Sequence, residues 1–271
     1  MTQVKEIIFW LIQEDATEEE LTWIKEKSAL QAKLPLAFVS TPRFVGKREL
    51  KHNTLVINHL YVGSWTLDRL VRVYYLLCLE SSNQDNFDTQ INSLFDTAEI
   101  NESVALYSAL TLFQNPEKWL LMATNAVRSN IGTVFDAIAF GNPYPFYFFP
   151  EQAWNQLVLK CIFNEKPIHK IYGLDERANQ DLANTVSDFA HERWAAGRKI
   201  PSQVWRLVVN FLTENILKDL ETLFQSEAID NQIAATLVCQ FSDNDLAQKL
   251  LEKYPQMLNF ENLSWEYLEN V

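Results

Sequence analysis

Turn-forming residues are scarce in this chain, and their scarcity limits the folds open to it. Only 6 glycines and 9 prolines occur in 271 residues. A β-sandwich, a β-barrel or a doubly wound sheet needs many tight turns, which these two residue types supply. Apolar residues instead recur at helical spacing, as in "TLDRLVRVYYLLCLE" over residues 66–80. These features predict an all-α protein.

Helical spacing and end signals predict the individual helices. Thr17 is a candidate N-cap, and the acidic triplet that follows it favours a helix start within residues 17–38. Pro116 opens a long helical stretch that ends near Gly141. Further helices are predicted over residues 151–163, 180–196, 201–223, 226–240, 243–254 and 262–269.

Two segments of the chain resemble each other. Residues 94–110 align without a gap on residues 223–239, so that Leu94, Phe95 and Ile100 match an identical series of residues. The spacing is similar to that of HEAT-type hairpins, which bury their apolar faces by stacking on neighbours. We therefore expect a single domain over residues 1–271, built of stacked antiparallel helical hairpins in a HEAT-like right-handed superhelix. Its C-terminal hairpins are expected over residues 207–271.

Charge and cysteine usage narrow the range of partners and compartments. The formal net charge of −12 disfavours nucleic acid and lipid headgroups, which are bound through clustered Lys and Arg. The apolar run over residues 7–12 is too short to span a membrane. Cys78, Cys161 and Cys239 each lie in an apolar stretch, which is typical of buried reduced thiols. We expect a cytoplasmic protein with no nucleic-acid binding and no direct membrane insertion.

The segment "GNPYPFYFFP", residues 141–150, combines three prolines with five aromatic rings. Proline restricts the residue before it to extended conformations, which predicts an open, structured connection. Each ring carries about 150 to 250 Å² of surface, so most rings need a cover. Two interpretations stay open: the rings plug the core between two helices, or some of them line a site for an apolar metabolite or a partner protein.

A second dense segment places Asp188, His191 and Glu192 within little more than one helical turn. An Asp, a His and a Glu at this spacing can form an acid–base group or supply metal ligands. The segment "HERWA" lacks the second histidine of a zincin motif. Ion pairs with nearby arginines are the structural alternative.

Several reaction motifs are missing from the sequence. Phosphate-binding glycine loops, a nucleophile elbow and paired C-x-x-C motifs do not occur. We accordingly expect no cofactor and no metal.

Five ordered blocks, "VFDAIAFGNPYP", "AWNQLVLKCIF", "GLDERAN", "DFAHERWAAGR" and "WRLV", resemble those of EboA-domain proteins over about residues 94–206. The chain departs from the family pattern in its "FYFF". The resemblance implies no catalytic residues and a part in moving a natural-product precursor. It implies partners encoded in the same gene cluster, among them a membrane prenyltransferase and a metallohydrolase. The motif core that it implies comprises Asp136, Asn142, Pro143, Asp175, Glu176, Arg177, His191, Glu192, Arg193 and Trp194.

Two functional hypotheses follow. The first, which we prefer, is a non-enzymatic adaptor that binds a partner protein or an apolar or aromatic metabolite. The second is an enzyme or metal-dependent accessory that uses Asp188, His191 and Glu192. The candidate binding residues are Asp136, Asn142, Tyr144, Phe146, Tyr147, Asp175, Glu176, Arg177, His191 and Arg193.

Overall fold

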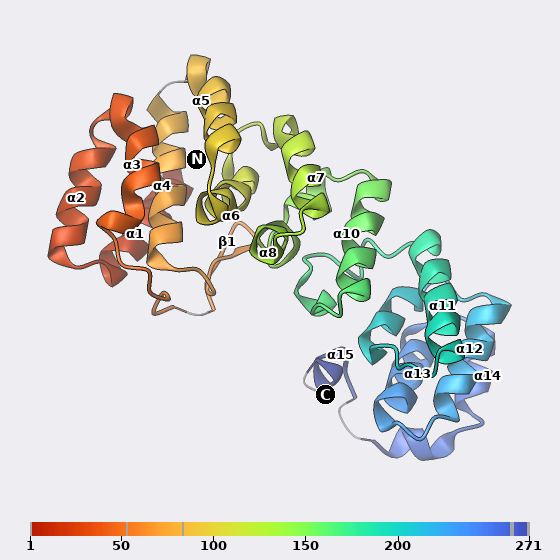
Figure 1. Cartoon of the computed structure of the whole chain (residues 1–271). Coiled ribbons are helices and arrows are strands. Elements are labelled where there is room, and N and C mark those ends of the chain that lie inside the picture. Colours follow the sequence, from red (N-terminus) through yellow and green to blue (C-terminus); the bar gives the residue numbers. More distant parts are fainter. Residues whose placement is uncertain (1, 53, 83, 261–262, 270–271) are drawn as a thin grey trace. The chain divides into compact units, whose positions relative to one another are not determined.

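The structure, a computed structural model, describes residues 2–52, 54–82, 84–260 and 263–269. Most of these residues are helical, which confirms the all-α prediction (Figure 1). They form two compact units, residues 1–150 and residues 151–271, and each unit is described by itself. The predicted single domain stays a prediction. Within the described ranges, no helix combines the length and the apolar character that crossing a membrane requires.

The first unit consists of helices and one short hairpin. Its elements are α1 (Thr2–Asp15), α2 (Glu18–Ser28), η1 (Gln31–Lys33), α3 (Leu34–Ser40), η2 (Thr41–Arg43), β1 (Val56–Ile57), β2 (Leu60–Tyr61), α4 (Leu67–Ser82), α5 (Gln84–Thr97), α6 (Ile100–Ala109), η3 (Leu110–Leu112), η4 (Pro116–Trp119), α7 (Leu120–Arg128), α8 (Gly132–Ala139) and α9 (Tyr144–Phe148).

Helix α4 is the centre of the first unit. Leu70 and Val71 are fully buried and Leu76 is 1% exposed, and at the helical spacing these three side chains point to different sides of the helix. A helix that is apolar on all sides needs neighbours on all sides. In the structure α1, α3 and α6 pack around α4, and α6 in turn packs on α8 (Figure 1).

The predicted helix ends are partly right. Thr17 caps α2 through the amide of Glu20, as expected, but the helix ends at Ser28 and a second helix, α3, follows. The long helix predicted after Pro116 is also wrong, because the chain turns between α7 and α8. There the hydroxyl of Ser129 accepts the amide N–H of Ile131, a local hydrogen bond that competes with the helix.

A short β-hairpin that the sequence analysis missed lies between α3 and α4. Strands β1 and β2 pair antiparallel, with Val56 opposite Tyr61. Asn58 and His59, the two turn residues between them, have positive φ angles of 47° and 66°. Two positive φ angles are typical of the turn that matches the twist of a two-residue hairpin, and asparagine tolerates this conformation well. The pattern "VINHLY" was therefore the available signal.

The second unit contains helices and connecting loops, with no strand among its described residues. Its elements are α10 (Glu151–Phe163), η5 (Ile168–Lys170), α11 (Gln180–Ala195), η6 (Ser202–Val208), α12 (Glu214–Phe224), α13 (Ile229–Phe241), α14 (Asp245–Leu251), η7 (Pro255–Asn259) and α15 (Trp265–Leu268). Helix α13 is its centre and packs against α12, α14 and η6.

The helix predicted over residues 201–223 is wrong. A 3-10 helix, η6, follows Pro201, and α12 begins only after Thr213. The hydroxyl of Thr213 accepts the amide N–H of Ile216 and so caps a new helix.

The two similar segments share local structure but differ in packing. The matched residues Ile100 and Ile229 each begin a helix, α6 and α13. Helix α13 packs against α12, the helix before it, whereas α6 packs chiefly on α4 and α8. The alignment therefore predicted where the helices start, and the tertiary environment set their neighbours.

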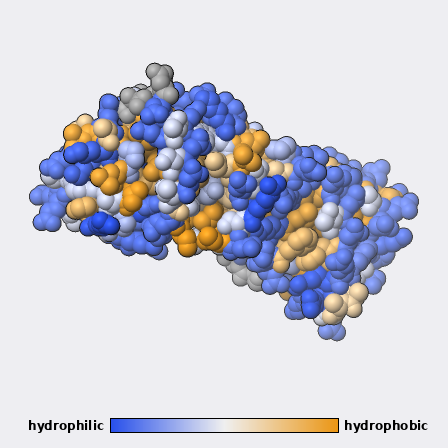
Figure 2. Space-filling view, turned by 45° about the horizontal axis from the view of Figure 1, so that its top comes forward, coloured by the Kyte–Doolittle hydropathy of each residue, from blue (hydrophilic) through white to orange (hydrophobic). Residues whose placement is uncertain are grey.

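The three cysteines are free and buried, as predicted. On the face shown in Figure 2, hydrophobic side chains gather in separate patches among polar ones. Scattered exposed apolar residues are ordinary in folded proteins, so a patch needs further evidence before it indicates binding.

Candidate functional site

The proline-rich segment forms a short helix, α9, and not the open connection predicted from its prolines. The prediction of an extended Tyr144 is wrong, because Pro145 lies in the first turn of α9. Backbone N–H groups in the first turn have no acceptor within the helix, so the missing N–H of proline costs nothing there. The side chain of Asn142 starts this helix: its Oδ1 accepts the amide N–H of Tyr144 at 3.0 Å.

Two candidate binding residues in this segment are buried. Asn142 is 1% exposed, and its Nδ2 donates to the carbonyl oxygens of Ala137 at 3.0 Å and Tyr107 at 3.4 Å. Tyr144 is 0% exposed, and its hydroxyl donates to the carbonyl oxygen of Pro116 at 2.6 Å. Burial raises the pKa of Tyr144, so its hydroxyl stays a donor. Both side chains support α9 from beneath and are not part of its surface.

The remaining rings divide between the core and the surface. Phe149 is buried, Phe146 and Phe148 are half-buried, and Tyr147 is 52% exposed. The ring of Tyr147 lies edge to face with Phe146, at 5.0 Å between centroids. Some rings of this segment therefore fill the core, as the first interpretation expects, and others face outward.

The β-hairpin extends this exposed ring cluster. The amide of Tyr61 donates to the carbonyl oxygen of Gly141 at 2.7 Å, which ties β2 to the start of the segment. The ring of His59 lies 6.5 Å from that of Tyr147. Val56 and Tyr61, a cross-strand pair, are both exposed. We call Val56, His59, Tyr61, Phe146, Tyr147 and Phe148 the α9 surface. Asp136 lies half-buried on α8 of the same unit.

In the second unit, the charged motif residues mostly hold the fold together. The guanidinium of Arg206 donates to both carboxylate oxygens of Asp175, at 2.7 and 2.6 Å, in a bidentate pair. Arg206 also lies over the ring of Trp265 at 5.7 Å and reaches Glu269 at 3.9 Å. This pair joins the loop before α11 to η6 and α15.

Arg177 and Asn179 connect the same loop to α10. The guanidinium of Arg177 lies 4.7 Å from the ring centroid of Trp154, and loss of solvent lowers its pKa. Asn179 exchanges two hydrogen bonds with Asn155, at 2.8 and 3.2 Å, and caps α11. Glu176, by contrast, is exposed, and its side chain makes no hydrogen bond or ion pair with a described residue.

The end of α11 is held by Arg193. Its Nε donates to the carbonyl oxygen of Lys199 at 2.7 Å, and its Nη2 lies 3.0 Å from Glu165. Beside it, the ring of Trp194 stacks on that of Trp205 with a centroid distance of 6.0 Å.

His191 pairs with an aspartate that the sequence analysis did not single out. Its Nε2 lies 2.6 Å from Oδ1 of Asp219 on α12, and the hydroxyl of Ser187 donates to Oδ2 at 2.5 Å. Asp219 is 3% exposed. The side chains of Asp188 and Glu192 are exposed, and neither bonds to a residue in the described ranges. No hydrogen bond or ion pair between described residues links the side chains of Asp188 and Glu192 to His191.

A pattern in α12 could have revealed Asp219. The buried Ile216, Leu220 and Leu223 recur at helical spacing, and Asp219 falls on the same face. A buried carboxylate on an apolar face needs hydrogen-bond partners, and His191 and Ser187 are those partners.

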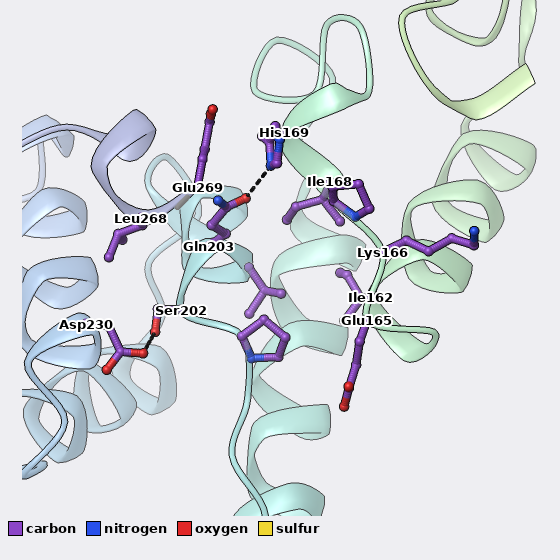
Figure 3. A pocket seen from close by; sticks show the side chains of 13 residues that line it. Ile162, Glu165, Lys166, Ile168, His169, Ser202, Gln203, Asp230, Leu268 and Glu269 are labelled. Carbon is purple, nitrogen blue, oxygen red and sulfur yellow. Dashed lines mark hydrogen bonds between the residues drawn. The ribbon is translucent and has the colours of Figure 1, made fainter. Parts of the chain in front are cut away.

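One cavity in this unit has a volume of about 280 Å³ and lies beside His169 (Figure 3). Its apolar wall includes Ile162, Ile168 and Leu268. Its polar groups include two hydrogen-bonded pairs, His169 with Gln203 at 3.2 Å and Ser202 with Asp230 at 2.6 Å. Within the described ranges, no group of three or more His, Cys, Asp and Glu side chains is placed to hold a metal ion.

Fold and site define a mostly helical protein whose motif arginines and carboxylates fasten one element to another. A family model, metabolite traffic protein EboA, matches residues 4–209. The chain belongs to the EboA family, which confirms the resemblance seen in the sequence. The match extends well beyond the motif blocks and includes nearly all of the first unit. No curated protein and no solved structure matches the chain.

Proposed function

We propose that this protein is a non-enzymatic adaptor in metabolite traffic that docks a partner protein on the α9 surface, in the cytoplasm. The observation that carries the proposal is the exposure of Tyr147 on a helix fixed from below by the buried Asn142 and Tyr144. A rigid exposed ring loses little conformational entropy on binding, and tyrosine is enriched at interface hot spots.

A protein partner suits this surface better than an enclosed metabolite. The rings lie on a short helix and a hairpin, and Tyr147, Tyr61 and Val56 all present exposed area. The cavities that include His169, Arg206 and Trp194 are lined by residues of the second unit. The expected partners are the membrane prenyltransferase or the metallohydrolase that the family resemblance implies. We further propose HEAT-like, right-handed stacking for the helical hairpins, of which α12 and α13 are an example.

The test compares two matched tyrosines. Tyr147 is 52% exposed on α9, and Tyr267 is 53% exposed on α15. Each is replaced by serine. The variant is immobilised on a sensor surface, and binding of the purified prenyltransferase and of the purified metallohydrolase is measured by surface plasmon resonance. Tyr147→Ser should weaken binding to one of them by about tenfold or more, whereas Tyr267→Ser should leave it unchanged. Absence of wild-type binding to both proteins, or equal behaviour of the two variants, contradicts the proposal.

One observation favours the second hypothesis, acid–base chemistry. A buried carboxylate, Asp219, orients the imidazole of His191, as general bases require. In this form the hypothesis uses His191 and Asp219, with Asp188 and Glu192 at its exposed edge. His191→Gln should then abolish substrate turnover, while the variant keeps the melting temperature of the wild-type protein. Equal losses of turnover and stability would assign the pair to the fold.

A further inference from the structure

A second cavity in the second unit lies beside the motif block "DFAHERWAAGR". It has a volume of about 470 Å³ and is bounded by the end of α11, the loop that follows, and the turn from α12 to α13. This volume is within the range of about 300 to 1,000 Å³ that is typical of small-molecule sites. We call it the Trp194 cavity.

Two cations of this cavity have no side-chain partner among the described residues. The side chains of Arg198 and Lys199 line it, are exposed, and make no hydrogen bond or ion pair with any residue that the structure describes. In a chain with 35 acidic and 23 basic residues, adjacent unpaired cations at a cavity are unexpected. Two adjacent cations attract an anion. The planar guanidinium of an arginine can also bind a carboxylate or a phosphate through two parallel hydrogen bonds.

The neighbouring acidic groups leave this positive charge in place. Asp219 is bound to His191 and Ser187, and Asp230 is bound to the hydroxyl of Ser202 and lines the other cavity. Glu227, in the turn before α13, is exposed and does not line the Trp194 cavity.

A hydroxyl adds a donor to the same wall. The Oγ of Ser226 accepts the amide N–H of Ala228 at 3.2 Å and the Nδ2–H of Asn231 at 3.0 Å. Both bonds use its lone pairs, so its own O–H is left to donate. An anion that reaches Arg198 and Lys199 can take this third donor.

The rest of the cavity wall is apolar and contains a fixed ring. Trp194 stacks on the fully buried Trp205, with 18° between the ring planes, which holds its orientation. Ile200 and Leu223, both buried, complete this wall. A planar apolar group can stack there with little loss of side-chain entropy, because the ring is already positioned.

We propose that the Trp194 cavity binds an aromatic acid, a flat apolar body that carries one carboxylate or phosphate. The head group contacts Arg198, Lys199 and the hydroxyl of Ser226, and the body lies along Trp194. The adaptor would thus have a small-molecule site in addition to its docking surface. This inference does not depend on partner docking at the α9 surface.

The experiment uses the full chain and four probes: 1-naphthyl phosphate, 1-naphthoate, 1-naphthol and inorganic phosphate. Binding is followed by titration calorimetry and by quenching of tryptophan fluorescence. At least one naphthyl acid should bind saturably and about tenfold more tightly than 1-naphthol and inorganic phosphate. The better of the two acids identifies the head group. Equal binding of 1-naphthol, equal binding of inorganic phosphate, or no saturable binding overturns the proposal.

A matched pair of double variants locates the site. Arg198→Gln with Lys199→Gln removes two positive charges from the cavity. Lys218→Gln with Lys249→Gln removes two exposed positive charges elsewhere in the same unit. All four side chains are exposed, so both variants should fold. The first variant should weaken binding of the preferred acid about tenfold, and the second should have little effect. If both variants weaken binding equally, the effect comes from the overall charge of the protein and not from this cavity, and the assignment is overturned.

Discussion

Replacement of Asn142 by alanine tests how the buried chemistry beneath α9 maintains its surface. The native side chain makes two hydrogen bonds at 3.0 Å, to the carbonyl of Ala137 and from the amide of Tyr144, and a longer one to Tyr107. Alanine leaves the two closer backbone groups without a partner at a site that is 1% exposed. A buried polar group without a partner costs about 1 to 3 kcal/mol, so two such groups predict a loss of roughly 2 to 4 kcal/mol after relaxation.

This loss is measurable against a total stability of about 5 to 15 kcal/mol for a typical domain. Urea unfolding followed by circular dichroism gives the free energy of unfolding, and hydrogen exchange at the amides of Tyr147 and Phe149 reports on α9 itself. Asn92→Ala is the control, because Asn92 is exposed within α5 and alanine is the better helix former. It should change stability by less than about 0.5 kcal/mol.

The reasoning is refuted if Asn142→Ala costs less than about 1 kcal/mol, the lower limit for one unsatisfied buried group. It is equally refuted if the α9 amides keep their wild-type protection. In either case the side chain of Asn142 would not be what holds the helix.

Three further predictions concern other parts of the chain. Gly141 has φ +58°, and a β-carbon there would lie 2.7 Å from the β-carbon of Tyr61. Gly141→Ala should therefore lower the free energy of unfolding in urea by about 2 kcal/mol. In the control, Gly132→Ala, the added β-carbon meets no atom within 4 Å, so this variant should be neutral or stabilising. Hydrogen bonds from Arg48 lower the pKa of Glu20 from 4.5 to about 2, so the stability that this ionised group contributes is complete above pH 4.5 and is lost as the pH falls towards 2. Glu20→Gln should flatten melting temperature against pH in this window, and an unchanged slope would contradict the assignment. Burial raises the pKa of Cys239 to about 12, so iodoacetamide at pH 8 should label this thiol in urea and not in the native protein, as mass spectrometry can show.

The limits of sequence-based prediction are clearest at helix ends. The start of α11 and the whole of α10 match their predictions, because their apolar spacing and end residues agree. Residues 201–223 carry similar spacing, yet Thr213 caps a new helix in their middle. Hydroxyl side chains that hydrogen-bond to the nearby backbone compete with the hydrogen bonds of a helix. The spacing of apolar residues gives no information about this competition.

The functional residues divide in the same way. Sequence blocks singled out Asp175, His191 and Arg193, but their partners come from distant segments. Asp219 is 28 residues from His191, and Arg206 is 31 residues from Asp175. Proximity of this kind depends on how helices pack, so a helical wheel of α11 cannot reveal it.

The sequence by itself determined the helical class of the protein, its EboA family and its buried thiols, because these follow from local spacing, composition and ordered motifs. Only the tertiary structure decided that Tyr144 is buried while Tyr147 is exposed, and that Arg198 and Lys199 line a cavity in which no described residue pairs with their side chains. The physical reason is that burial and pairing depend on neighbours distant in the chain. Two tyrosines three residues apart have nearly the same local preferences, and the elements packed around them set which ring loses its contact with water.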